Sequence, residues 1–76
     1  MSKRIQRLLE ALNSNRFNCR FADVERLLLA LGFTRRKTSG SHVIFALESR
    51  IISVPKRTPL KQVYVDHLLE LVKPLL

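Results

Sequence analysis

A single histidine in this chain stands where a residue with acid–base chemistry would be useful. His42 follows the polar segment 38–41 and opens the apolar segment 43–45. Imidazole gains and loses a proton near neutral pH, so it can serve as a general acid or a general base. Cleaving RNA without a metal needs such a group, either to deprotonate the 2′-hydroxyl or to protonate the departing 5′-oxygen. His42 is therefore the candidate catalytic residue, and a structural role at the turn is the alternative.

The sequence around His42 is strongly basic. The chain has 14 Lys and Arg against 6 Asp and Glu, which gives a net charge of +8. Residues 35–61 hold seven of these bases and a single acid, Glu48. Positive charge gathered in this way is typical of a surface that binds nucleic acid, and an acidic protein partner fits the same field.

Eight residues near His42 are candidate RNA contacts. Basic side chains attract phosphate oxygens, Gly40 lets the backbone approach a ligand closely, and Ser41 offers a hydroxyl and an amide. The bases before the last predicted helix lie near its N-terminus, where free amides also attract phosphate. The set comprises Arg35, Arg36, Lys37, Gly40, Ser41, Lys56, Arg57 and Lys61.

Other kinds of chemistry have little support in the sequence. Cys19 is the single cysteine, a usage typical of a reducing compartment, so we expect a cytoplasmic protein. The two histidines have no Cys or carboxylate at ligand spacing, so we expect no metal and no cofactor. Ser41 lacks the partners of a catalytic nucleophile, and no glycine-rich phosphate loop is present. Because no apolar run exceeds five residues, we expect no membrane span.

Hydrophobic periodicity predicts three helices. Apolar residues recur at i, i+3, i+4 and i+7 over residues 3–12 and again over residues 22–31. Gly32 follows the second of these helices, where a left-handed C-cap is expected. A third helix is predicted over residues 61–72, with His67 as a partly buried packing residue. Its apolar arc is wider than a small sheet needs, so it is either deeply buried or the contact of a homodimer.

Between Gly32 and Pro55 the apolar period changes from 3.6 to 2. This change predicts antiparallel strands over residues 33–37, 42–47 and 50–54, with a tight turn at residues 48–49. In the second strand Val43 and Phe45 alternate with His42, and the bulkier set should face the helices. His42 should therefore lie on the opposite face of the sheet or at its rim.

The same alternation applies to the basic first strand. Arg35 and Lys37 are predicted to share one face of that strand, and Arg36 to take the other.

The expected fold is α+β, with a three-stranded antiparallel sheet and helices packed on one of its faces. We expect one domain over residues 1–76, in which residues 1–20 form an N-terminal helical extension and residues 21–76 the α-β-β-β-α core. This core has the layout of double-stranded-RNA-binding domains, which read the shape and phosphates of RNA.

Three short motifs resemble the HicA family of toxin ribonucleases. They are Leu31-Gly32-Phe33, then Arg36, then the Gly-Ser-His-Val-Ile-Phe segment 40–45, and the likeness runs from about Phe21 to Leu71. The resemblance implies a double-stranded-RNA-binding-like fold and metal-independent cleavage of mRNA, which arrests translation. It also implies a HicB-like antitoxin that covers the histidine. By position, His42 matches the family's catalytic histidine, and Gly40 and Ser41 match its turn.

Two functions follow from these observations and stay open at this point. The first is an endoribonuclease toxin in which His42 is the general acid or base. The second is a non-catalytic RNA-binding module with the same fold and surface. A protein-interaction role for the last helix is compatible with either.

Overall fold

The computed structural model of the chain describes residues 3–14, 19–56 and 60–76. This part of the chain contains helices and strands in the order α1 (Lys3–Ser14), α2 (Phe21–Ala30), β1 (Thr34–Ser39), β2 (His42–Leu47), β3 (Arg50–Pro55), α3 (Gln62–Val72) and the short 3-10 helix η2 (Lys73–Leu75). The predicted α+β class and the α-β-β-β-α order after a first helix are confirmed. Within the described residues, no helix combines the length and apolar character needed to cross a membrane.

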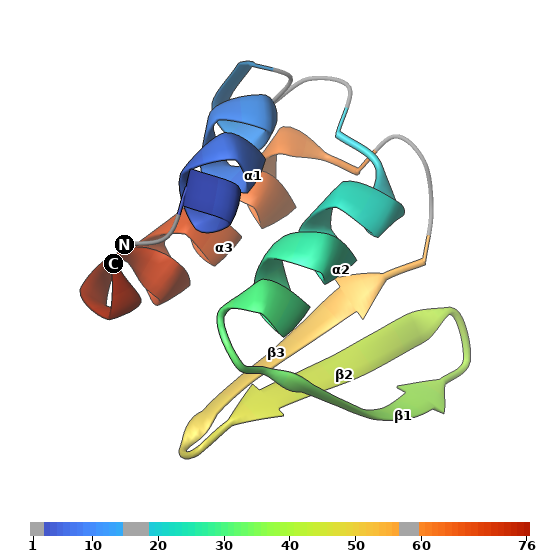
Figure 1. Cartoon of the computed structure of the whole chain (residues 1–76). Coiled ribbons are helices and arrows are strands. Elements are labelled where there is room, and N and C mark those ends of the chain that lie inside the picture. Colours follow the sequence, from blue (N-terminus) through green and yellow to red (C-terminus); the bar gives the residue numbers. More distant parts are fainter. Residues whose placement is uncertain (1–2, 15–18, 57–59) are drawn as a thin grey trace.

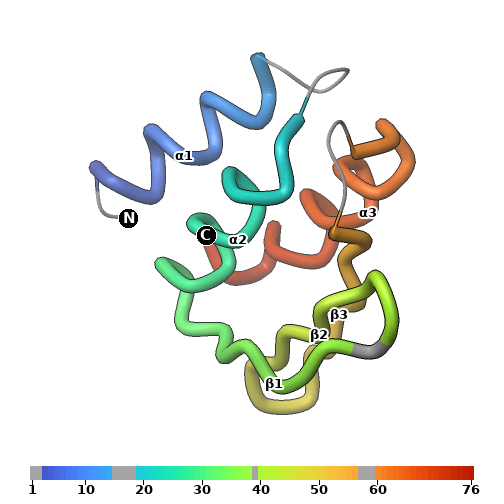
Figure 2. Tube along the Cα trace, turned by 90° about the vertical axis from the view of Figure 1, so that its right-hand side faces the viewer, coloured from blue at the N-terminus to red at the C-terminus, as the bar shows by residue number. Residues whose placement is uncertain are grey.

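The strands form one antiparallel sheet in the order β1-β2-β3. Helices α2 and α3 lie on the same side of this sheet, and α1 packs against α2 on the side of the helices away from the sheet (Figures 1 and 2). The helices therefore cover one face of the sheet, as the sequence predicts. In the part of the chain that the structure describes, no helix covers the other face, which we call the open face.

Two predicted bounds need correction. Helix α1 continues through Asn13 and Ser14, which the sequence marks as helix breakers. These residues are exposed at the end of the helix, where their poor helix propensity costs little and the packing of the buried Leu12 holds the last turn. Strand β1 runs to Ser39, so the turn before His42 is only two residues long.

The end of α2 is fixed by a glycine, as predicted. Gly32 has a φ of 103°, a conformation that side chains with a Cβ rarely adopt. The N–H of Phe33 donates to the Leu28 carbonyl at 2.9 Å, and the N–H of Gly32 donates to the Leu29 carbonyl at 3.1 Å. This pair of bonds is the Schellman motif. It turns the chain from the helix layer directly into β1.

Strand β3 forms one edge of the sheet and ends at Pro55. The N–H of Lys56 bonds to the Ser41 carbonyl, and paired residues of an antiparallel ladder alternate between bonded and non-bonded pairs. The next pair, Pro55 with His42, is therefore non-bonded, so the proline nitrogen points outward. Proline removes no ladder bond at this position, which explains why the strand tolerates it.

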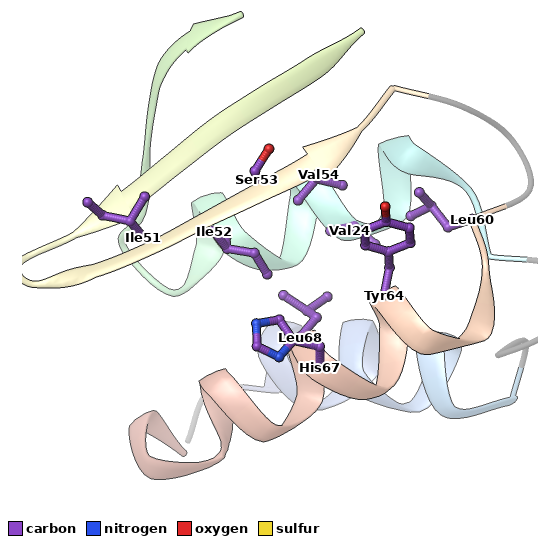
Figure 3. Close-up of a pocket in the computed structure, with 9 residues that line it drawn as sticks. All are labelled: Val24, Ile51, Ile52, Ser53, Val54, Leu60, Tyr64, His67 and Leu68. Carbon is purple, nitrogen blue, oxygen red and sulfur yellow. The ribbon is translucent and has the colours of Figure 1, made fainter. Parts of the chain in front are cut away.

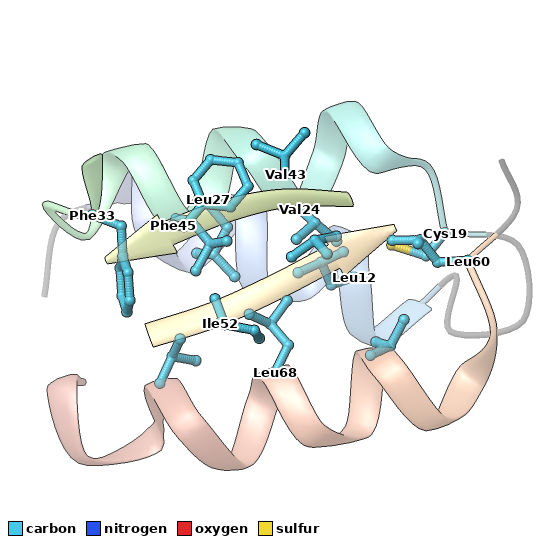
Figure 4. Packing of buried hydrophobic residues seen from close by; sticks show 14 residues of the cluster. Leu12, Cys19, Val24, Leu27, Phe33, Val43, Phe45, Ile52, Leu60 and Leu68 are labelled. Carbon is cyan, nitrogen blue, oxygen red and sulfur yellow. The ribbon is translucent and has the colours of Figure 1, made fainter. Parts of the chain in front are cut away.

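Buried apolar side chains fill the space between the sheet and the helices (Figure 4). Phe45 of β2 is at the centre, fully buried, with its ring centroid 6.3 Å from that of Phe21 in α2. Each described element except β1 and η2 contributes to this core. The buried apolar residues are Leu12, Cys19, Val24, Leu27, Leu28, Phe33, Val43, Phe45, Ile52, Val54, Leu60, Val65, Leu68 and Val72.

Cys19 joins two distant parts of the chain. Its carbonyl accepts a bond of 2.8 Å from the N–H of Leu60, which ties the segment before α2 to the segment before α3. Burial and, to a smaller extent, the nearby Asp23 carboxylate together raise the pKa of the Cys19 thiol to about 11. The thiol therefore stays protonated in the folded protein at neutral pH.

This raised pKa predicts a loss of stability at alkaline pH. In the unfolded chain the thiol ionises near 9.0, so between pH 9 and pH 11 only the unfolded state releases this proton. The free energy of unfolding should therefore fall as the pH rises through this window, by about 1 to 3 kcal/mol. Urea unfolding at pH 8 and pH 10.5 measures it, with Cys19→Ala as the control because this variant lacks the thiol and keeps every other ionisable group. Parallel pH profiles for the two proteins would contradict the prediction.

Candidate functional site

His42 lies on the open face of the sheet. Along β2 the fully buried Val43 and Phe45 alternate with the half-buried His42 and Ile44. Buried positions face the helices, so the half-buried positions point the other way. The predicted orientation of His42 is confirmed.

The turn before His42 is a two-residue hairpin. Ser39 pairs with His42, which leaves Gly40 and Ser41 as the two turn residues. Gly40 has a φ of 60° at the first turn position, as a type II′ turn requires. A Cβ added at Gly40 would meet nothing within 4 Å, so the turn is open to a ligand. The glycine is thus required for the backbone conformation, and the space beside its Cα is free.

The end of β3 lies next to this turn. His42 pairs with Pro55, and the N–H of Lys56 donates to the carbonyl of Ser41 at 2.6 Å. The Lys56 side chain is exposed. The hairpin formed by β1, the turn and β2 therefore meets a segment that is distant in sequence, the end of β3, beside His42.

A β-bulge in β1 changes the predicted faces of its basic residues. Arg35 pairs with Phe45 and Lys37 pairs with Ile44, so Arg36 is an extra residue between them. Residues that pair across antiparallel strands lie on the same face. Lys37 therefore shares the open face with His42, whereas Arg35 shares the helix face with Phe45. The prediction that Arg35 and Lys37 lie on one face is wrong, because the bulge breaks the alternation.

Arg35 makes an ion pair with the helix layer. Its guanidinium Nη1 lies 2.9 Å from the Glu25 Oε2 of α2. This contact anchors β1 to α2 and separates Arg35 from the other basic residues of the strand. Arg36, by contrast, lies beside Ile44 and Ala46 on the open face, together with Lys37.

The acidic residues are placed away from His42. Five of the six acids of the chain lie on the three α-helices. The sixth, Glu48, lies in the β2–β3 turn at the opposite end of β2 from His42. Its carboxylate is 3.9 Å from the guanidinium of Arg50. The positive potential of Lys37, Arg36 and Lys56 therefore dominates the end of the sheet that carries His42.

Two further predicted contacts, Arg57 and Lys61, precede α3 in the sequence. Lys61 is exposed at the N-cap of α3, five residues after Lys56 in the sequence. Arg57 lies outside the described residues. Its predicted role therefore stays a prediction.

His67 differs from its sequence prediction. It is exposed and lines an apolar groove of about 260 Å³ between β3 and α3. His67 and Tyr64 extend from α3 into this space, opposite Ile52 and Val54 (Figure 3). The prediction of a partly buried packing residue is wrong, because α3 turns Val65, Leu68 and Val72 toward the core and leaves His67 beside that face.

Sequence reasoning missed a hollow on the open face of the sheet. It has a volume of about 480 Å³, begins two residues along β2 from His42, and is lined by Arg36, Lys37, Ile44, Ala46, Glu48 and Ile51. The available signal was the second alternation of β2 and β3, in which Ile44 and Ile51 are apolar on the side away from the core. An apolar patch on the solvent-facing side of a sheet is typical of a surface that binds a ligand or a partner.

Among the described residues, no three His, Cys, Asp or Glu side chains come together in a way that could hold a metal ion. The family model for the HicA toxin of bacterial toxin-antitoxin systems matches residues 21–72, from the first residue of α2 to the last of α3. Neither a curated protein nor a solved structure gives a significant match.

Proposed function

Because the chain belongs to the HicA family of bacterial toxins, we propose that it is an endoribonuclease that cleaves mRNA and thereby inhibits translation. The observation that carries this proposal is the position of His42. Its imidazole lies on the open face of the sheet, beside an unobstructed turn and at the basic end of the molecule. An imidazole, which can act as general acid or general base, thus lies where positive charge attracts RNA phosphates.

In the proposed reaction the 2′-oxygen of RNA attacks the adjacent phosphorus, and the bond from phosphorus to the 5′-oxygen breaks. His42 either takes the 2′-hydroxyl proton or gives a proton to the departing 5′-oxygen. Lys37 shares the open face with His42 and stabilises the negative charge that develops on the phosphorane oxygens. These steps use proton transfer and charge stabilisation by side chains of the chain itself.

The other predicted contacts hold the RNA strand in this proposal. Arg36 and Lys56 flank the end of the sheet that carries His42, and Gly40 and Ser41 offer the amides of the turn to a phosphate oxygen. Lys61 extends the basic surface toward the start of α3, and Arg57 stays a further proposed contact. Arg35 contributes by anchoring β1 through its ion pair with Glu25.

Family membership also points to a protein partner. A toxin of a toxin-antitoxin system has an antitoxin, and a HicB-like antitoxin that covers the open face would block access to His42. An enzyme that acts on mRNA works where mRNA is translated, so we place its action in the cytoplasm. A homodimer through α3 is a further proposed contact, and Tyr64 of this helix is 37% exposed.

One observation favours a second candidate function, an RNA-binding module without catalysis. Acid–base cleavage of RNA moves two protons, and His67 lies on α3 in a different groove from His42. The second proton must therefore be handled by a group other than histidine. If no such group is supplied, the same basic surface would bind RNA without cleaving it.

Incubating the purified protein with mRNA in EDTA separates the two functions. We expect fragments that carry 2′,3′-cyclic phosphate ends, because the 2′-oxygen is the nucleophile in the proposed reaction. The fragments are separated on a denaturing gel, and their ends are identified by mass spectrometry. Intact RNA that nonetheless shifts on a native gel would favour the binding module.

A further inference from the structure

The hollow on the open face has a floor and a rim of different chemistry. Its floor consists of Ile44 and Ala46 of β2 and Ile51 of β3, and its rim carries Arg36 and Lys37. Ile51 is 66% exposed and forms a contiguous apolar patch with Ile44 and Ala46. Exposing this apolar surface costs solvation free energy, so a ligand that covers it would gain affinity.

Charge is distributed unevenly along the hollow. The bulge in β1 turns both Arg36 and Lys37 toward it, and Lys37 lies on the side nearer His42. Glu48 lies at the opposite end of β2. A phosphate is therefore favoured at the end that carries His42 and disfavoured at the other end. A ligand that fits has an anionic part near His42 and a flat, weakly polar part over the isoleucines.

We propose that this hollow binds an unpaired nucleobase of the RNA strand, next to the phosphate that the 2′-oxygen attacks with His42 as acid or base. The proposal rests on the proposed function and names the form of RNA that the site takes. A nucleobase in a duplex is stacked between its neighbours and cannot lie on the floor of the hollow. A nucleobase in a single strand can lay its apolar face on Ile44 and Ile51, while the adjoining phosphate meets Lys37.

The hollow also explains why the bulge lies in this part of β1. Without the extra residue, either Arg36 or Lys37 would point toward the helices. With it, two cations from consecutive positions reach one side of the hollow. Bulges are found next to active sites, where they direct a side chain toward a ligand.

Binding to RNA tests the proposal in the His42→Ala background, which prevents cleavage during the measurement. The probes are a fluorescent single-stranded RNA of about twelve nucleotides and a strand of the same length that lacks the bases in its central part. Ile51→Ser should weaken binding of the intact strand by about 5- to 20-fold, in line with the loss of one base contact. It should leave binding of the base-free strand unchanged, because the phosphate contacts remain.

Val63→Ser provides the matched control. Val63 is also 66% exposed, but it lies on α3 and outside the hollow. We expect its RNA affinity to equal that of the parent protein. Ile51→Thr keeps the strand preference of the original residue and should give a smaller loss than Ile51→Ser in the same direction. Circular dichroism of each variant confirms that it is folded.

The possible results separate this proposal from the proposed function. If wild-type protein cleaves mRNA but Ile51→Ser binds intact RNA as tightly as the parent, the base site is overturned and the ribonuclease remains. The open face would then suit a protein partner. An equal loss for intact and base-free strands would also overturn the base site, since it would locate the effect in charge or folding. If the wild-type protein neither binds nor cleaves RNA, both proposals fail.

Discussion

Replacing His42 by alanine is expected to reduce the rate of RNA cleavage by about 10²- to 10⁴-fold, the range by which a positioned acid or base contributes to catalysis. The affinity for RNA should be nearly unchanged, because the phosphate contacts come from Lys37, Arg36 and Lys56. The fold should also be retained, because His42 is half-buried on the open face and contributes nothing to the buried apolar core. Single-turnover cleavage in EDTA measures the rate, and anisotropy measures the affinity.

The chain offers a matched control for this experiment. His67 is the other histidine, and it is exposed on α3 in the groove beside β3. His67→Ala removes the same functional group and should cleave RNA at the wild-type rate. Equal cleavage by wild type and His42→Ala would remove His42 from the mechanism. A drop for His67→Ala as large as that for His42→Ala would show that the assignment to the open face is wrong.

Replacing Phe45 by alanine should abolish stable folding at 37 °C. The ring is fully buried between α2 and the sheet, in contact with Phe21. Truncating a buried Phe costs about 3 to 5 kcal/mol, the sum of lost transfer free energy and a cavity. Domains are stable by only about 5 to 15 kcal/mol, and a chain of 76 residues should be at the low end of this range.

Urea unfolding followed by circular dichroism measures this effect. Ile51→Ala is the control, since it also truncates a large apolar side chain in the sheet, but one that is 66% exposed. We expect its stability to stay within about 1 kcal/mol of wild type. A Phe45→Ala protein with a midpoint close to that of wild type would contradict the packing described for the core.

The periodicity of the sequence was enough to predict the fold and the side of the sheet on which His42 lies. Helical spacing over residues 3–12 and 22–31 and the alternation of Val43 and Phe45 are local signals, because each depends on neighbouring residues of one element. Gly32 was equally informative, since its position after an amphipathic helix predicts the left-handed cap that the structure contains.

The bulge at Arg36 could not be predicted in this way. It depends on the register between β1 and β2, which is set by which apolar side chains of the two strands meet in the core. The run Arg35, Arg36 and Lys37 contains no apolar residue that would fix its own register. For the same reason the sequence could not show that Arg35 would meet Glu25, ten residues earlier in the chain, nor that Arg36 would reach the hollow.

Because Leu12 of α1 is buried in the core, the chain cannot be shortened to the residues that match the family without loss of packing. The family match starts at Phe21, yet Leu12 is only 1% exposed and Cys19 hydrogen-bonds to Leu60 in front of α3. A fragment limited to residues 21–72 would expose the apolar surface that Leu12 now covers. It would also lose the hydrogen bond between Leu60 and Cys19, which holds the segment before α3 in place. The part of the chain needed for a stable fold is therefore larger than the part that matches the family, because α1 covers one side of the core.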